Sequence, residues 1–454
     1  MRGFLASSIG VTCAAALALP LTLPSSGARA AAPYVPSAAG PATEAVPGST
    51  QSLPLVPLGS DRSPAPAGAS EQGLNQRDVR PFSLVGVVWN DPGADLRGTV
   101  QVRTRATGAA TWSGWQQVEA HNGEHAPDAD DPDRAAGTVR GSTAPLWVGA
   151  SDGVEVRVKP ERPATADRSA VTSLPEGLRL ELVDPGDEAP PKGAQIDVGR
   201  APALTAESAA ASAVNAELAP IGAAVIPELT KRQTENDLIA ARGGSEAVNK
   251  ARPHIGPRPR IITRRGWGAN EKLRERNFAY TKTVKAAFLH HSASGNNYRC
   301  SQAGSVLRGI YRYHVKSSGW RDFGYNFAVD KCGNIYEGRA GGVAKPVLAA
   351  HTRGFNANTT GIAVIGSYST TTPPKKALNA IARLTAWKLG LYGANPRGTT
   401  YLKSGGGNLY KKGRNVRLHV IAGHRDGFAT ACPGSRLYKK LGKARTSSAR
   451  FQGR

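Results

Sequence analysis

The sequence predicts a multidomain protein in which a small all-β domain precedes an α/β domain, with disordered linkers beside them. The chain has 454 residues, more than one typical domain needs. Residues 79–186 contain short runs that alternate apolar and polar side chains between Gly, Pro and Asp turns, the pattern of a sandwich or barrel. Residues 258–445 instead mix apolar strand-like runs with helical periodicity. The two globular regions therefore belong to different classes.

Six alternating runs support the all-β domain, and they span 82–89, 98–106, 112–118, 144–150, 153–159 and 178–183. The domain carries no motif that translates into chemistry. Four tryptophans are candidates for stacking on sugars, although core positions are equally compatible with them: Trp89, Trp112, Trp115 and Trp147. The acidic run 128–133 lacks the Gly and distal Glu of a standard calcium loop, so a solvated loop is favoured over calcium binding.

Strands and helices both appear in the α/β domain. Strand-like runs occupy 285–290, 325–330, 361–366 and 416–423. Between the first two runs, Leu307, Ile310, Tyr311 and His314 fall on one face of a helix that Ser301 opens. A second helix is expected from about 375 to 389, where Gly390 ends it.

The remaining segments are expected to serve targeting and connection. Residues 1–30 carry a basic start, a short apolar stretch and an Ala-Arg-Ala cleavage site, so we interpret them as a signal peptide rather than a membrane anchor. Residues 31–78 are rich in Pro, Ala, Ser and Gly, as expected for a disordered linker. Residues 187–257 are expected to be a linker with one weak helix, and 446–454 a flexible tail. The prediction is a secreted, extracellular protein associated with the cell wall and without a stable membrane span.

Basic residues concentrate in the C-terminal region. Residues 258–454 hold 36 Lys and Arg against 6 Asp and Glu, a charge of +30, so the rest carries −6 of the total +24. This charge predicts attraction to a polyanion. Nucleic acid is excluded because no zinc-finger spacing, recognition helix or RNA-binding aromatic motif accompanies the charge, and because the signal peptide exports the chain. Anionic wall polymers or membrane lipids fit better.

Histidine and cysteine at strand ends indicate a metal site. His290 and His291 end an apolar run, and strand alternation sends them to opposite faces. His424 closes another apolar run, and Cys432 follows eight residues later before Pro-Gly. Imidazole and thiolate together suit Zn²⁺. Beyond the predicted signal peptide the chain has three cysteines, an odd number that suggests one disulfide and one thiol held by something else.

Six motifs of the C-terminal region resemble the family of zinc-dependent N-acetylmuramoyl-L-alanine amidases and peptidoglycan recognition proteins, across about residues 258–445. They are R-x-x-W-G-A (264–269), F-L-H-H-S-A (288–293), G-W-x-D-x-G-Y-N-F (319–327), Y-E-G-R (336–339), A-H-T-x-G-x-N (350–356) and G-H-R-D-x(5)-C-P-G (423–434). The resemblance implies a central mixed β-sheet flanked by helices, with a groove above one zinc ion. It also implies that the zinc ligands are His290, His424 and Cys432.

The resemblance further implies an activity and supporting residues. A secreted peptidoglycan hydrolase would use zinc-activated water to cut the amide between N-acetylmuramic acid and the L-alanine of the stem peptide; the alternative is a non-catalytic recognition protein, in which that Cys is typically replaced. Tyr325 and Thr430 would stabilise the transition state, and His351 would line the groove. Further candidate groove residues are Trp320, Arg321, Asn326 and Arg339.

The assignment of Cys432 to zinc leaves two cysteines. Cys300 and Cys332 remain to form a disulfide, with two free thiols as the alternative.

The proton acceptor is a separate question. Some bacterial relatives place a general-base Glu on the strand that matches 361–366, but this strand has no carboxylate. The proton acceptor therefore stays open, and Asp426 is a second candidate that is more simply explained as a loop cap.

Overall fold

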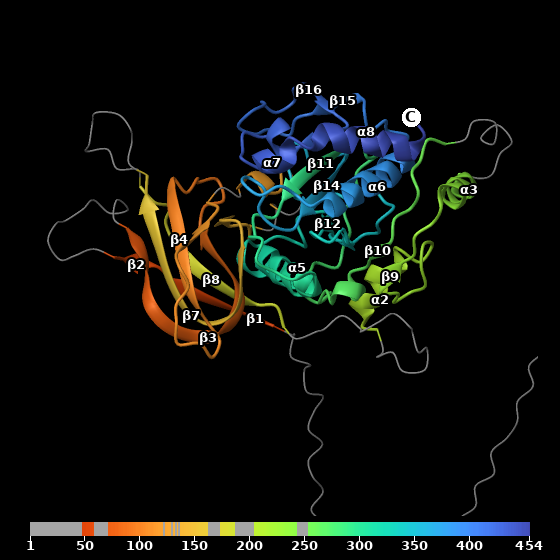
Figure 1. Ribbon diagram of the computed structural model, residues 1–454. Coiled ribbons are helices and arrows are strands. Elements are labelled where there is room, and N and C mark those ends of the chain that lie inside the picture. The colour runs from red at the N-terminus through yellow and green to blue at the C-terminus, as the bar shows by residue number, and fades with distance from the viewer. Residues whose placement is uncertain are drawn as a thin grey trace, which may run out of the picture. The chain divides into compact units, whose positions relative to one another are not determined.

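The computed structural model describes residues 48–58, 71–120, 123–128, 130–131, 134, 137–161, 173–186, 204–242 and 253–454. Within it, Val46–Arg454 form one compact unit, shown in Figure 1. The predicted signal peptide lies outside the described residues. Among the described helices, none combines the length and the apolar character needed to cross a membrane.

The N-terminal region is an antiparallel sheet of eight strands in the order β1-β8-β3-β7-β4-β5, with β2 and β6 also paired to β3. The strands are β1 (Ser49–Pro54), β2 (Val56–Pro57), β3 (Gln72–Trp89), β4 (Gly98–Ala106), β5 (Gln116–Val118), β6 (Gly141–Ser142), β7 (Leu146–Pro160) and β8 (Arg179–Asp184). Alternate valines of β4 and β7 point into its core, as the sequence pattern predicted. The sheet begins earlier than expected, because β1 pairs with β8 and Leu55 and Leu74 are buried in its core.

The C-terminal region contains a seven-stranded mixed sheet in the order β17-β11-β14-β12-β13-β10-β9. The strands are β9 (Val225–Ile226), β10 (Ile261–Ile262), β11 (Ala286–His291), β12 (Phe327–Val329), β13 (Ile335–Glu337), β14 (Thr359–Val364) and β17 (Ile421–Gly423). β11 runs parallel to both of its neighbours, β14 and β17. A separate hairpin joins β15 (Thr399–Lys403) to β16 (Asn415–His419).

Helices cover both faces of this mixed sheet. α6 (Lys375–Leu391) and α8 (Leu441–Gln452) pack with Ile362 and Val364 of β14 on one face. α5 (Ala303–Arg312) packs with Ala363 of the same strand on the other face. A short helix, α7 (Ser435–Tyr438), follows the loop that contains Cys432. The α/β class expected for this region is thus observed, because alternate residues of β14 serve two apolar layers.

Two segments that we expected to be a linker and a tail contain packed elements. Residues 204–242 form α2 (Ala206–Ala213), β9 and α3 (Lys231–Ala241), and β9 extends the mixed sheet by pairing with β10. Side-chain hydrogen bonds from Thr205 and Thr230 cap the two helices. At the other end, α8 continues to Gln452, whose side chain is buried and donates to Ala386 O. α2 matches the weak helix expected in the linker, whereas the low aromatic content of 187–257 concealed the packing of β9 and α3.

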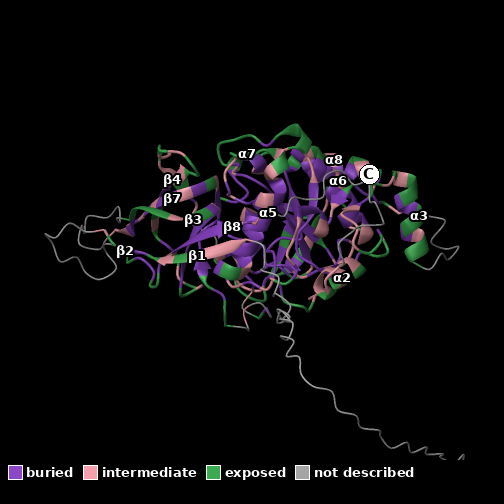
Figure 2. Cartoon of the chain, turned by 90° about the horizontal axis from the view of Figure 1, so that it is seen from below, coloured by how far each residue is buried: buried purple, intermediate pink, exposed green. Residues whose placement is uncertain are grey.

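The β-domain packs directly against α5. Leu84, Trp147 and Val183 of the sheet share one apolar cluster with Leu307 and Ile310 of the helix. In Figure 2 the ribbon of β8 and α5 is coloured mostly as buried. The two regions therefore share a core.

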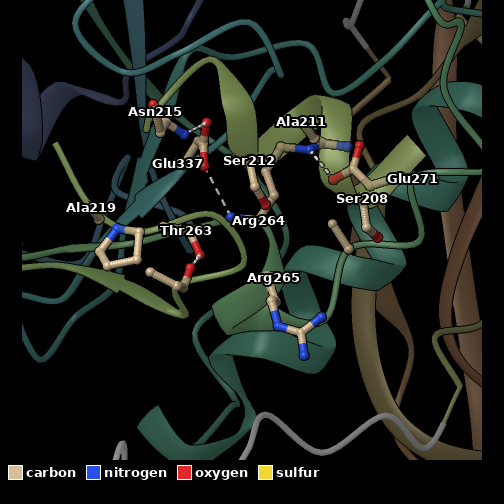
Figure 3. Close-up of a pocket in the computed structure, with 13 residues that line it drawn as sticks. Ser208, Ala211, Ser212, Asn215, Ala219, Thr263, Arg264, Arg265, Glu271 and Glu337 are labelled. Atoms are coloured by element: carbon tan, nitrogen blue, oxygen red, sulfur yellow. Dashed lines mark hydrogen bonds and ion pairs between the residues drawn. The ribbon is translucent and has the colours of Figure 1, made fainter. Parts of the chain in front are cut away.

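A buried ion cluster joins two of the sequence motifs (Figure 3). Arg264 donates from Nε to Glu271 Oε1 (2.7 Å) and from its backbone N–H to Glu337 Oε2 (3.1 Å). Asn215, beyond α2, donates to the other oxygen of Glu337 (2.8 Å), and Trp267 Nε1 donates to the Glu337 carbonyl (2.7 Å). Burial raises the pKa of Glu337 to about 7. Buried hydrogen bonds thus join the motifs that contain Arg264 and Glu337 to each other and to α2.

Candidate metal centre

Adjacent parallel strands bring the first two expected ligands together. His290 lies at the end of β11, and His424 follows β17 directly. Because β11 and β17 are parallel neighbours, their carboxyl ends meet at one edge of the sheet. The loop after His424 returns Cys432 to the same edge, where Arg425 N–H donates to the Cys432 carbonyl (3.1 Å).

The structure adds a fourth residue to these three. One donor atom from each of His125, His290, His424 and Cys432 lies within 4.8 Å of the others. Cys432 Sγ is 3.8 Å from His290 Nδ1 and 3.6 Å from His125 Nε2. Donors of a tetrahedral zinc with Zn–N near 2.0 Å and Zn–S near 2.3 Å are separated by roughly 3.5 Å. The separations of Cys432 Sγ from His125 Nε2 and His290 Nδ1 are close to this value.

The state of these side chains also fits a metal. All four are buried, and both ring nitrogens of His424 lack a hydrogen-bond partner among the described residues. Burial, reinforced by the neighbouring imidazoles, lowers the pKa of His290 and His424 well below the usual value. The rings are therefore neutral, which is the form that binds zinc. A buried cation would also compensate for burying the Cys432 thiolate.

A chain of buried polar groups orients His290 behind the site. With Nδ1 facing Cys432, the other ring nitrogen, Nε2, lies 3.4 Å from Thr352 Oγ1. Thr352 Oγ1 is 3.0 Å from His351 Nδ1, and His351 Nε2 is 3.2 Å from Thr359 Oγ1, which donates to Phe355 O. When each group donates its hydrogen toward Phe355 O, every group from His290 to Phe355 has a hydrogen-bond partner. His351, expected in the groove, is fully buried and links Thr352 to Thr359 in this series of hydrogen bonds.

The two expected catalytic side chains both lie at the site. The Tyr325 ring centroid is 5.3 Å from that of His290, and burial raises its pKa well above the usual value, so its phenol stays protonated. Thr430 Oγ1 accepts from Cys432 N–H (3.1 Å) and donates to Glu124 Oε1 (2.7 Å). Tyr325 thus keeps a hydroxyl hydrogen near the metal-ligand candidates, whereas that of Thr430 is donated to Glu124.

The four expected groove residues are bound largely to the protein itself. Trp320 is buried, with its ring 4.4 Å from that of His314. Asn326 donates to Val347 O and accepts from Gly361 N–H, so both ends of its amide hold backbone. Arg339 donates to Phe323 O, and Arg321 pairs with Glu275 (2.5 Å). Arg321 and Arg339 line one small cavity together.

The other candidates have structural partners. Cys300 and Cys332 form a disulfide, and Cys432 is the free cysteine among the residues that the structure describes. Asp426 accepts from Gly423 N–H (2.8 Å) and from Tyr438 Oη (2.5 Å), which matches the loop-cap interpretation.

Sequence reasoning missed His125 and Glu124, which form the short 3-10 turn Gly123–His125 of the β-domain. Both side chains are buried at the metal-ligand candidates. Nothing in the local pattern assigns them, because the turn lies in a polar segment without strand or helix periodicity. The one sequence signal is that His125 is a rare residue type, since the chain has 9 His in total; Glu124 has no such signal.

Comparison with known proteins finds matches for two regions of the chain. Residues 280–435 match the family described as N-acetylmuramoyl-L-alanine amidase, and residues 36–176 match a family described as Rv3811 N-terminal galactose-binding domain-like. Peptidoglycan-recognition protein SC2 of Drosophila melanogaster is 31% identical over 183 residues, which cover 40% of this chain and 84% of that protein. Peptidoglycan-recognition protein 1 of Holotrichia diomphalia is 28% identical over 187 residues, covering 40% and 79%. The solved structure of wild-type Drosophila PGRP-LB is 26% identical with a TM-score of 0.32, covering 40% of this chain and 91% of that one.

Proposed function

The chain belongs to the N-acetylmuramoyl-L-alanine amidase and peptidoglycan recognition protein family, and on that premise we propose that it is a secreted zinc amidase. Its substrate is peptidoglycan, and the bond cut is the amide between N-acetylmuramic acid and L-alanine. The observation that carries this proposal is the convergence of His290, His424 and Cys432 at one sheet edge. Two imidazoles and a thiolate would make a catalytic rather than a structural zinc site whenever the fourth position is left to water or substrate.

Zinc held by these three residues would supply a Lewis acid and lower the pKa of water toward neutrality. The protein's part is to position the ligands and the substrate carbonyl. Thr352 fixes the His290 ring through Nε2, which leaves Nδ1 for the metal. In the overall reaction the oxygen of water adds to the carbonyl carbon of the lactyl group and the C–N bond breaks. The L-alanine nitrogen takes a proton from that water and leaves as an amine.

Tyr325 and Thr430 have the chemistry to stabilise the oxyanion of the tetrahedral intermediate. The phenol of Tyr325 stays protonated because burial raises its pKa. Protonated donors in a dry site stabilise developing negative charge strongly. Thr430 is held next to Cys432 by the Cys432 N–H, although Glu124 occupies its hydroxyl proton in this structure.

The basic C-terminal region suits a wall substrate. Residues 258–454 carry +30, and exposed lysines and arginines extend over the β15–β16 hairpin, including Lys403, Lys411 and Arg417. Anionic wall polymers would be attracted to this charge over about one Debye length. Retention on isolated walls is therefore expected to weaken as salt rises.

The test is hydrolysis of purified peptidoglycan, scored as new L-alanine amino groups and as new reducing sugar ends. We expect amino groups without reducing ends, and we expect a chelator or Cys432→Ala to abolish them. His419→Ala, at an exposed histidine of β16, is the matched control and should release amino groups at the wild-type rate. Binding to peptidoglycan with no release by any zinc-loaded variant would instead support the recognition-protein alternative.

A further inference from the structure

The β-domain places a histidine among the metal-ligand candidates of the C-terminal region. His125 Nε2 lies 3.6 Å from Cys432 Sγ, and its ring centroid is 4.5 Å from that of His424 and 5.3 Å from that of His290. The His125 ring is buried, and its Nδ1 has no hydrogen-bond partner among the described residues. A nitrogen donor of the β-domain thus lies beside all three of the other ligand candidates.

We propose that His125 is a fourth protein ligand to the zinc and that the segment 123–128 thereby holds the enzyme in a latent state. The latency rests on the proposed amidase function, whereas the ligand assignment does not. A zinc with three protein ligands keeps one position for water or substrate, but four protein ligands close the coordination sphere. The amidase is active only when His125 leaves.

Hydrogen bonds to one loop, residues 353–356 before β14, fasten the segment 123–128 in place. Its Glu124 carbonyl accepts from Arg353 N–H (2.8 Å), and its Ala126 carbonyl accepts from Asn356 Nδ2 (3.3 Å). Asp128 Oδ1 accepts from Gly354 N–H (2.5 Å) and from Asn356 Nδ2 (3.1 Å).

The side chain of Glu124 adds a contact inside the site itself. Its Oε1 accepts from Thr430 Oγ1 at 2.7 Å, and so occupies the hydroxyl proposed to assist catalysis. The segment 123–128 thus blocks both the metal position and one oxyanion donor.

Burial of the whole cluster agrees with a closed state. His290, His424 and Cys432 are each 0% exposed, and Tyr325 is 3% exposed. A muramyl peptide cannot reach atoms that solvent does not reach. The β-sheet can remain docked on α5 while a short segment moves, because the docking contacts of Leu84 and Trp147 lie elsewhere.

The contrasting arrangement makes Glu124 the carboxylate that β14 lacks, with the β-domain completing the active site. It predicts that hydrolysis falls when the segment is loosened. The latent arrangement predicts that hydrolysis rises. The two arrangements therefore predict opposite changes in the rate of hydrolysis when the segment 123–128 is loosened.

The experiment uses the full chain with ¹⁵N-labelled histidines and zinc added to the metal-free protein. Two-bond ¹H–¹⁵N spectra follow each ring, and the His125 signals are assigned by their loss in His125→Ala. We expect the His125 ring nitrogens to shift in step with those of His290 and His424, and to saturate at one zinc per chain. The exposed His254 is the internal control and is expected not to move.

Zinc retention and hydrolysis are then measured on the same proteins. His125→Ala is expected to lose zinc to a chelator about tenfold or more faster and to release stem peptide about tenfold or more faster. Asp128→Ala, which frees the segment without removing a ligand, should move both rates in the same direction. His254→Ala should move neither.

The outcomes separate the two proposals. Unshifted His125 signals, or zinc retention in His125→Ala equal to wild type, overturn the ligand assignment. Slower hydrolysis in both His125→Ala and Asp128→Ala overturns the latency and favours Glu124 as a catalytic carboxylate. Shifted His125 signals with no hydrolysis by any variant overturn the amidase function and leave the ligand assignment intact.

Discussion

Gly86 of β3 faces Tyr313, the residue that follows α5, across the contact between the β-domain and the C-terminal region. Tyr313 is fully buried, and its hydroxyl lies 3.1 Å from Thr143 O and 3.3 Å from Val87 O. A Cβ added at Gly86 would lie 2.4 Å from Tyr313 Oη and 2.6 Å from two ring carbons. Gly86→Ala therefore forces Tyr313 and the sheet apart by roughly 1 Å to restore ordinary contact.

Overpacking of this kind costs about 1–3 kcal/mol. Because the strain acts between the two regions, we expect it to appear as a lower free energy of unfolding in urea at an unchanged m-value. The same strain should favour a state in which the β-domain has separated from α5 by about 5–150-fold. A chelator should then extract zinc faster. Gly114→Ala is the matched control, since nothing lies within 4 Å of its added Cβ. A Gly86→Ala protein as stable as Gly114→Ala would refute the docking geometry.

Three further predictions concern single side chains. Burial raises the pKa of Glu337 from 4.5 to about 7, so the unfolded chain releases this proton at lower pH than the folded chain and about 3 kcal/mol of stability is lost as pH rises from 4.5 to 7. Urea unfolding at pH 5 and 7.5 should show a smaller loss of stability in Glu337→Gln than in the wild type. An equal loss would contradict the raised pKa of Glu337. Tyr325→Phe should slow stem-peptide release about 100-fold with unchanged zinc content, as metal analysis and a hydrolysis assay would show; an unchanged rate removes Tyr325 from the mechanism. Thr352→Val removes the partner of His290 Nε2 and should weaken zinc binding about 10–100-fold in chelator competition; unchanged affinity means that the hydrogen bond does not orient the ring.

The sequence was most informative where the chemistry is local. Apolar periodicity predicted both domain classes. Strand ends marked His424 and one of His290 and His291 as candidates, and the family motifs selected His290; the structure brings His290 and His424 together because parallel neighbours place their carboxyl ends at one edge. Cys432 followed from its donor chemistry and from the family motifs. The disulfide of Cys300 with Cys332 followed from this assignment.

What the sequence could not give is contact between distant segments. The β-domain's His125 reaches Cys432 across 307 positions, and no periodicity encodes a turn that is held by another domain's backbone. β9 was missed for a related reason, since a two-residue strand such as Val225–Ile226 has no alternation to detect. Asn326 was a candidate groove residue whose contacts spacing could not assign, and its amide holds the backbone of Val347 and Gly361.

The most direct test of the central claim is hydrolysis of peptidoglycan in ¹⁸O-labelled water by the zinc-loaded His125→Ala protein, read by mass spectrometry of the fragments. The proposed amidase predicts that the heavy oxygen appears in the lactyl carboxyl of N-acetylmuramic acid, while the stem peptide leaves unlabelled with a free L-alanine amine. Label in a new reducing sugar end or within the stem peptide, or release that survives removal of Cys432, would contradict a zinc amidase built on His290, His424 and Cys432.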